Sequence, residues 1–339
     1  MTPFPTTAAP RSAPPQPMDP ETFRARFAAI EREIGRVIVG HAELVRLTVT
    51  ALVAGGHALV EGVPGLGKTL LMRTLSEVID GVFSRIQFTP DLMPADIVGT
   101  QILYEDPAGG RQFRFEPGPI FANFVLADEI NRATPKTQSA TLEAMQEQTV
   151  TVGKQSYRLP QPFFVLATQN PLEMEGTFPL PEAQLDRFLF KLDVPFPSTA
   201  ELVQIAERTT GAETPRPLRV AGVDTVVAMG RMARDVPVAA EVILYAARLV
   251  RATHPYDAAA PALVRDAVRY GASPRGLQAI LLGAKIHALL NGRLHVACAD
   301  VRAVTPPALR HRIILSFAGQ AEGVESDRVV GEVVRAVPE

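Results

Sequence analysis

Residues 62–69 restrict the possible folds of this chain more than any other segment, because they match the phosphate-binding pattern G-x-x-x-x-G-K-[ST] at every position. In chain order they are Gly62, Val63, Pro64, Gly65, Leu66, Gly67, Lys68 and Thr69. An apolar run, His57–Glu61, precedes them, and a helical pattern follows with one apolar face formed by Leu71, Leu75 and Val78. Glycines let the backbone N–H groups of such a loop turn toward phosphate oxygens, and the helix adds the positive end of its dipole. This order predicts an α/β sheet with a phosphate site at its edge, rather than a glycine-rich turn without chemical meaning.

The loop and one later strand together predict a nucleoside triphosphate site with a metal ion. Lys68 is expected to pair with the β- and γ-phosphates and Thr69 to ligate Mg²⁺, while Leu70 completes the segment expected to contact the nucleotide. A later apolar run ends in Asp128 and Glu129. Strand ends that face the loop are where open α/β sheets hold their ligands. We therefore expect Asp128 to hold Mg²⁺, directly or through water, and Glu129 to activate the attacking water as general base.

Composition excludes several other classes of protein. The 339 residues include 34 basic and 36 acidic side chains, and the net charge of −2 argues against a broad nucleic-acid or acidic-membrane surface, although a local basic patch stays open. The single cysteine, Cys298, excludes an internal disulfide framework and a multi-cysteine metal site. No apolar run approaches the roughly 20 residues that span a bilayer. We expect a cytoplasmic protein without stable membrane insertion.

Patterning predicts three parts along the chain: a disordered proline-rich tail over residues 1–20, an α/β core over residues 21–198 and a helical domain over residues 199–339. The core contains five short apolar runs that indicate a parallel sheet covered on both faces: His57–Glu61, Phe83–Phe88, Phe124–Ala127, Phe163–Thr168 and Phe188–Val194. Turn residues predict two hairpins that project from it, Gln101–Glu116 and Thr149–Leu159. Beyond the core, apolar spacing near 3.6 predicts helices at Thr199–Thr209, Ala239–Thr253, Leu277–Asn291 and Ala299–Arg310.

Five short strings, in this order, resemble the MoxR family of AAA+ ATPases: Phe88–Ile97, Asp128–Ala133, Ala167–Pro171, Leu180–Phe188 and Ser273–Gly276. The resemblance covers about residues 25–320. It implies an AAA+ P-loop core with a parallel five-stranded sheet and hairpin inserts, followed by a smaller all-α lid domain. It also implies ATP as the substrate, with Mg²⁺, and the chemistry of an ATPase.

The resemblance further implies roles for residues that spacing alone does not single out. Asn170 matches the sensor 1 position, where an amide orients water and contacts the γ-phosphate, and Arg187 matches the arginine finger that reaches into a neighbouring subunit. Arg275 matches sensor 2, which contacts the γ-phosphate within its own subunit. Val39 and Gly40 resemble the segment that packs on adenine.

Plainer interpretations of these residues stay open. An Asn before Pro commonly starts a turn. Asp186 and Arg187 could form a surface ion pair, and an arginine after Ser273-Pro274 could simply belong to a helix start.

At the level of the whole protein, the resemblance implies a homo-oligomer, most commonly a hexameric ring. It also implies chaperone-like remodelling, maturation or activation of a client protein together with a separate von Willebrand factor A domain protein. The two hairpins match inserts that face the central pore in related machines, or they only pack on the core. The alternatives are a nucleotide-gated scaffold with little turnover and a magnesium-chelatase-like motor subunit. A nucleic-acid motor is disfavoured, because the chain shows no helix-turn-helix pattern and no basic stripe.

Overall fold

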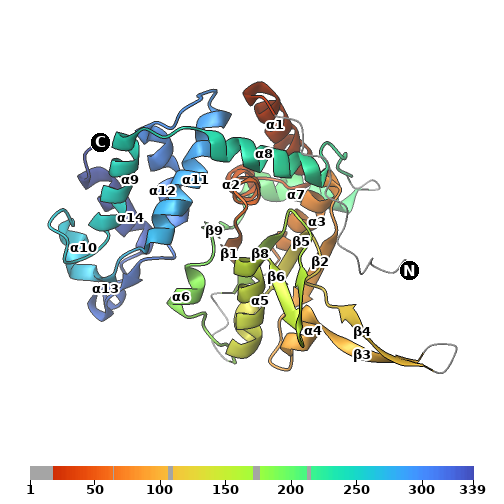
Figure 1. Cartoon of the computed structure of the whole chain (residues 1–339). Coiled ribbons are helices and arrows are strands. Elements are labelled where there is room, and N and C mark those ends of the chain that lie inside the picture. The colour runs from red at the N-terminus through yellow and green to blue at the C-terminus, as the bar shows by residue number, and fades with distance from the viewer. Residues whose placement is uncertain (1–17, 64, 106–109, 171–175, 212–214) are drawn as a thin grey trace.

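The computed structural model describes residues 18–63, 65–105, 110–170, 176–211 and 215–339. The predicted tail, residues 1–20, lies almost entirely outside the described residues, and so does Pro64. Figure 1 shows a core that contains the sheet and, beside it, a group of helices from the C-terminal part of the chain.

The core is built on one parallel sheet with the strand order β2-β5-β8-β1-β9. The five predicted strands are confirmed, at β1 (Ala58–Glu61), β2 (Phe83–Gln87), β5 (Phe124–Asp128), β8 (Phe164–Gln169) and β9 (Phe190–Asp193). All five run in the same direction, so their carboxyl ends meet at one edge of the sheet and their amino ends at the opposite edge. This shared direction decides which candidate residues can meet.

Helices cover both faces of the sheet, which explains why its strands lack alternation of polar and apolar residues. Phe124 and Phe164 pack into one apolar cluster with the helices α1, α2 and α3, whereas their neighbours Val125 and Val165 pack into a second cluster with α4 and α5. The core helices are α1 (Pro20–Val37), α2 (Ala42–Val53), α3 (Lys68–Ile79), α4 (Pro94–Val98), the 3₁₀ turn η1 (Ile130–Arg132), α5 (Pro135–Glu147) and α6 (Glu182–Leu185).

Both predicted hairpins are present. The first consists of β3 (Gly99–Glu105) and β4 (Arg111–Pro117), and it extends away from the core at the lower right of Figure 1. The second consists of β6 (Thr149–Val152) and β7 (Gln155–Arg158). The rings of Phe115 and Tyr157 stack with their centroids 4.0 Å apart, so the two hairpins support each other at their bases.

Beyond residue 198, the described residues are mainly helical, and they include one short pair of strands, β10 (Val268–Tyr270) and β11 (Ile314–Leu315). Its first helix, α7, lies along the core, because the Arg208 guanidinium donates to the carbonyls of Gly35 and Arg36 at the end of α1. No helix in the described part of the chain is long and apolar enough to cross a membrane. The helices are α7 (Thr199–Thr210), α8 (Val223–Asp235), α9 (Ala240–Ala252), α10 (Ala262–Ala267), α11 (Pro274–Leu290), α12 (Cys298–Leu309), α13 (Phe317–Ala321) and α14 (Ser326–Ala336).

Candidate active site

The loop that follows β1 has the backbone of a phosphate cradle. Gly65 and Gly67 have φ angles of +86° and +76°, a left-handed conformation that residues with a Cβ rarely adopt. The space where a Cβ would stand on either glycine is open, with no heavy atom within 4 Å. The helix α3 begins directly after Gly67, at Lys68, so its unpaired N–H groups point toward this space. The described part of the loop therefore fits an anionic phosphate group.

Lys68 lies inside this loop beside a group of acidic side chains. Its Nζ donates a hydrogen bond to the Gly62 carbonyl at 2.6 Å. Burial lowers the pKa of Lys68, and the negative charges of Asp128, Glu129 and Glu61 oppose that shift. Both predicted carboxylates are therefore near enough to interact with the charge of Lys68, and the parallel strands β1, β8 and β5 place the loop and the end of β5 at the same edge of the sheet. Thr69 follows in the first turn of α3, and the side chain of Leu70 is exposed.

Asp128 and Glu129 stand at the carboxyl end of β5 and are positioned by the neighbouring strand β8. The buried Thr168 hydroxyl donates to Asp128 Oδ1 at 2.7 Å and accepts from the Glu129 backbone N–H at 2.9 Å. Glu129 has a φ of +56°, a strained conformation for a residue with a side chain. The strained backbone at the end of β5 turns Glu129 out of the strand direction.

Two residues of β2 bind these carboxylates. The Arg85 guanidinium donates to Asp128 Oδ2 at 2.7 Å and 3.1 Å, and Gln87 Nε2 donates to Glu129 Oε2 at 2.9 Å. Arg132 contacts the same Glu129 oxygen at 3.2 Å. Both acidic side chains therefore have polar partners within the chain.

The remaining candidates for the nucleotide site lie in two places. Asn170 directly follows β8, between the ends of β5 and β1, and is buried. Val39 and Gly40 lie between α1 and α2, where Val39 is buried and a Cβ on Gly40 would stand 2.3 Å from Glu201 Oε1 of α7. Asn170 thus shares the edge of the acidic pair, whereas the adenine role of residues 39 and 40 stays a prediction.

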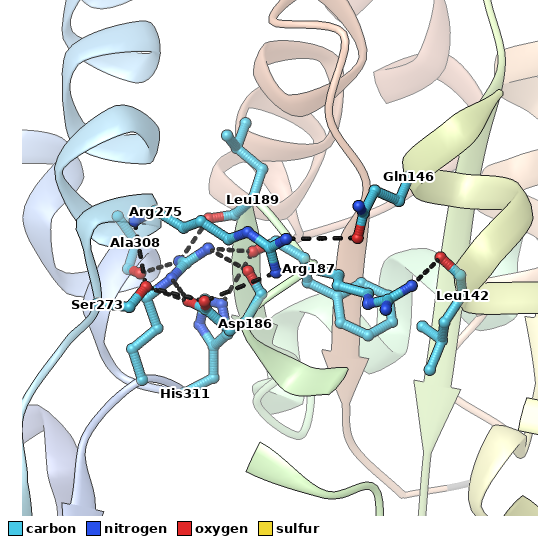
Figure 2. A network of polar contacts seen from close by, with 11 residues as sticks. Leu142, Gln146, Asp186, Arg187, Leu189, Ser273, Arg275, Ala308 and His311 are labelled. Atoms are coloured by element: carbon cyan, nitrogen blue, oxygen red, sulfur yellow. Dashed lines mark hydrogen bonds and ion pairs between the residues drawn. The ribbon is translucent and has the colours of Figure 1, made fainter. Parts of the chain in front are cut away.

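Arg187 and Arg275 lie at the opposite edge of the sheet. Arg187 precedes the amino end of β9, and its Nη1 donates to the Leu142 carbonyl at 2.8 Å. Arg275 Nη2 donates to Gln146 Oε1 at 3.3 Å, in the last turn of α5. Figure 2 shows the two arginines side by side, each reaching toward α5.

This placement requires a correction of one expectation. The four-residue strand β1, roughly 13 Å long at about 3.3 Å per residue, separates the Arg275 edge from the loop at its other end. The expected contact of Arg275 with the γ-phosphate of its own subunit does not fit this arrangement. The reason is the position of the lid, whose helix α11 packs at the amino edge of the sheet and holds Arg275 there.

A buried ion pair fixes the segment that carries Arg187. The Arg312 side chain is only 3% exposed, and its Nε donates to Asp186 Oδ1 at 2.8 Å. The Ser273 hydroxyl donates to the same carboxylate at 2.8 Å, and Arg275 Nη1 lies 3.8 Å from it. Asp186 therefore pairs with the lid, and the alternative of an Asp186–Arg187 surface pair is wrong.

Comparison with known proteins agrees with this arrangement. The family model described as "ATPase family associated with various cellular activities (AAA)" matches residues 57–190, and the one described as "AAA lid domain" matches residues 260–333. Chaperone MoxR1 of Mycobacterium tuberculosis is 42% identical over 99% of this chain and 89% of that protein. Protein MoxR of Methylorubrum extorquens is 32% identical over 93% of this chain and 94% of its own length. The chain belongs to the MoxR family of AAA+ ATPases.

A solved structure extends the likeness to three dimensions. A crystal structure of a candidate ATPase from Cytophaga hutchinsonii superimposes with a TM-score of 0.87 and 37% identity, covering 94% of this chain and 96% of the other. The predicted fold class, an AAA+ core followed by a helical lid, is confirmed.

The sequence alone does not reveal the polar residues that position Asp128 and Glu129. Arg85 and Gln87 lie two residues apart on β2, and strand alternation places both on the same face. The available signal is the polar pair at alternate positions on either side of the buried Ile86. Thr168 offers none, because its role depends on the pairing of β8 beside β5.

Proposed function

We propose that this MoxR-family protein hydrolyses ATP in the presence of Mg²⁺ and uses the reaction for chaperone-like remodelling of a client protein. One observation carries the proposal: Lys68, in a loop shaped for phosphate, lies in the field of Asp128 and Glu129 at one edge of the sheet. An NTPase needs these groups together, because a cation must bind the phosphates while a carboxylate handles the water.

In this scheme the loop N–H groups and Lys68 bind the β- and γ-phosphates, and Glu129 accepts a proton from the water that attacks the γ-phosphorus. Asn170 orients that water. The Thr69 hydroxyl and Asp128 would hold Mg²⁺, which neutralises charge that develops on the phosphate oxygens. Asp128 Oδ2 must then exchange its bonds to Arg85, and Glu129 must leave Gln87 and Arg132.

The two distant arginines favour catalysis between subunits. Arg187 and Arg275 lie at the edge opposite their own loop, so we propose that they meet the nucleotide of an adjacent copy in a ring, most simply a hexamer. Arginine supplied in this way is worth roughly 10³–10⁵ in rate in related phosphoryl transfers. A von Willebrand factor A domain protein as companion and a cytoplasmic location belong to the same proposal.

The test of hydrolysis is Glu129→Gln, which removes the proton acceptor and keeps the size of the side chain. We expect the variant to bind ATP with unchanged affinity by calorimetry and to release phosphate at least about a hundredfold more slowly. Glu143→Gln, at an exposed position of α5, is the matched control and should hydrolyse at the normal rate. Near-normal phosphate release from Glu129→Gln would remove Glu129 as the base.

A nucleotide-gated scaffold with little turnover is the second candidate. The hydrogen bond from Gln87 and the ion pair with Arg132 favour it, because both occupy Oε2 of the carboxylate that would have to accept the proton of the attacking water. The turnover of the purified wild-type protein at saturating ATP separates the two candidates.

A further inference from the structure

A cavity of about 200 Å³ lies between the core and the helical lid, at the amino edge of the sheet. Its described lining contains four arginines and one carboxylate. Asp186, Arg187, Arg234, Arg275 and Arg312 supply these charges, and Gly55, Gly56, Gln146 and Gln278 are among the other lining residues. Such an excess of guanidinium groups is typical of a site for an anion with several oxygens.

Three of the four arginines keep their charge largely uncompensated. Arg312 is the exception, because its Nε forms an ion pair with the Asp186 carboxylate at 2.8 Å. Arg187 donates to a backbone carbonyl, Arg234 donates to the Ala54 carbonyl at 3.3 Å, and Arg275 donates to an amide oxygen and lies 3.8 Å from Asp186. Neutral oxygens orient these heads but do not cancel their charge, so the cavity stays cationic.

An unsatisfied donor points to a missing acceptor in the same place. The Arg187 Nε is buried and has no hydrogen-bond partner, although a buried polar atom of this kind normally has one. A phosphate oxygen that entered the cavity would offer such an acceptor, and it would also meet the exposed guanidinium of Arg234. Arg234 stands at the end of α8, outside every motif in the sequence that predicts a site.

In the proposed ring this cavity faces the nucleotide of an adjacent copy of the chain, and we propose that Arg234 is a third arginine that contacts the terminal phosphate of that nucleotide. The proposal rests on the proposed function, because it takes the phosphate from the loop of that copy. A third cation helps to disperse charge on the equatorial oxygens as the γ-phosphoryl group is transferred to water. Its effect should therefore fall on the transition state rather than on the binding of ATP.

The first experiment compares Arg234→Gln with Arg231→Gln, an exposed arginine one turn earlier on the same helix that does not line the cavity. We expect Arg234→Gln to lower kcat by about tenfold or more, with KM for ATP within about twofold and unchanged oligomer mass. Arg231→Gln should match the wild type. If the wild type hydrolyses ATP and Arg234→Gln does so at the same rate, this inference fails and the proposed function stands; an inactive wild type removes both.

The second experiment asks where the phosphate comes from. The experiment mixes Arg234→Gln chains, which keep an intact loop, with Lys68→Ala chains, which keep an intact Arg234. A complete site can then form only where two different chains meet. The mixture should hydrolyse ATP faster than the two variants assayed separately, as should a reference mixture of Arg187→Ala with Lys68→Ala. Absence of this gain in the Arg234→Gln mixture overturns the inference. The inference is also overturned if the only effect of Arg234→Gln is a loss of product inhibition by inorganic phosphate, since that result indicates a site for the free anion.

Discussion

Glu129 combines three features at the end of β5: a left-handed backbone, an ion pair with Arg132 and a hydrogen bond from Gln87 of the neighbouring strand β2. The Thr168 hydroxyl, by accepting from the backbone N–H of Glu129, helps to hold the strained conformation. The carboxylate itself is bound by Gln87 at 2.9 Å, and Gln87 also accepts from Arg85 at 2.6 Å. A carboxylate held in this way must be released before it can accept a proton from water.

Replacing Gln87 by Ala should therefore raise the basal ATPase rate. A hydrogen bond to a charged group contributes about 1.5–3 kcal/mol, so its loss shifts Glu129 toward the free conformation by roughly tenfold or more; because the ion pair with Arg132 remains, we expect a rate increase of a few fold. Phosphate release at saturating ATP is the measurement, with Gln112→Ala on the exposed strand β4 as control. A rate equal to or below that of the wild type would show that Gln87 does not restrain Glu129.

The residues of the site divide into those that a contiguous pattern reveals and those that only the fold assembles. Lys68 and Thr69 belong to one octapeptide, and Asp128 and Glu129 end one apolar run, so the sequence predicts both groups. Arg85 reaches Asp128 across 43 positions of the chain, and this contact exists only because β2 pairs with β5. No local pattern encodes strand order, which is why such partners escape sequence analysis.

Among the secondary-structure elements, β1, β8 and α5 meet at one buried histidine. The ring of His57 accepts a hydrogen bond from the Val165 N–H at 3.0 Å through Nδ1, and its Nε2 lies 3.0 Å from the Met145 carbonyl. The neutral ring satisfies both contacts, with Nε2 as the donor. Burial lowers the pKa of His57 from 6.5 to about 4, and the hydrogen bond to Met145 opposes that shift.

This histidine should make stability fall in weakly acidic solution. Above pH 6.5 the ring is neutral in both the folded and the unfolded chain; between pH 6.5 and about 4 only the unfolded chain binds the proton. The free energy of unfolding should therefore decrease by up to about 3 kcal/mol over that range and level off below it. Urea denaturation at a series of pH values measures the slope.

The matched variants are His57→Gln, which removes the titrating ring, and His295→Gln at an exposed position. The slope should become smaller in the first variant and stay unchanged in the second. A slope remains in His57→Gln, because burial also lowers the pKa of His311. Equal slopes in all three proteins would exclude His57 as a source of the acid sensitivity.

The elements themselves are largely predictable. The helices α7, α9, α11 and α12 are predicted from their periodicity, whereas α8, α10, α13 and α14 are not. The helices α10 and α13 contain six and five residues, too few for a periodic pattern. The helices α8 and α14 do carry the helical pattern, because Val226, Met229 and Ala233 are buried along α8 and Val329, Val330 and Val333 along α14. Both were therefore within reach of the sequence.

Across the whole molecule, the sheet direction places the two halves of the proposed chemistry at opposite edges. The glycine loop and the acidic pair occupy the carboxyl edge, and the arginine cavity occupies the amino edge. The lid holds the cavity in shape through the buried Arg312, which also donates to the carbonyls of Leu189 and Phe188. A change in the lid position would move Arg275 and pull on Asp186, the neighbour of Arg187. In the proposed ring, each chain would contribute one half of two different sites.

A protein built in this way should lose activity on dilution. Because a lone chain does not bring its arginines to its own loop in the proposed scheme, the rate per chain should fall by at least about tenfold once the protein is diluted below the dissociation constant of the oligomer. Nucleotide affinity should stay nearly constant, since the loop and Lys68 belong to one chain. Mass photometry and phosphate release, measured on the same dilution series, connect assembly to turnover. Arg187→Ala, which lacks the group supplied to the neighbour, should be slow at every concentration, so its rate gives the baseline toward which the wild type falls. A constant rate per chain in a sample shown to be monomeric would place all catalytic groups within one subunit and contradict the arrangement derived from the sheet.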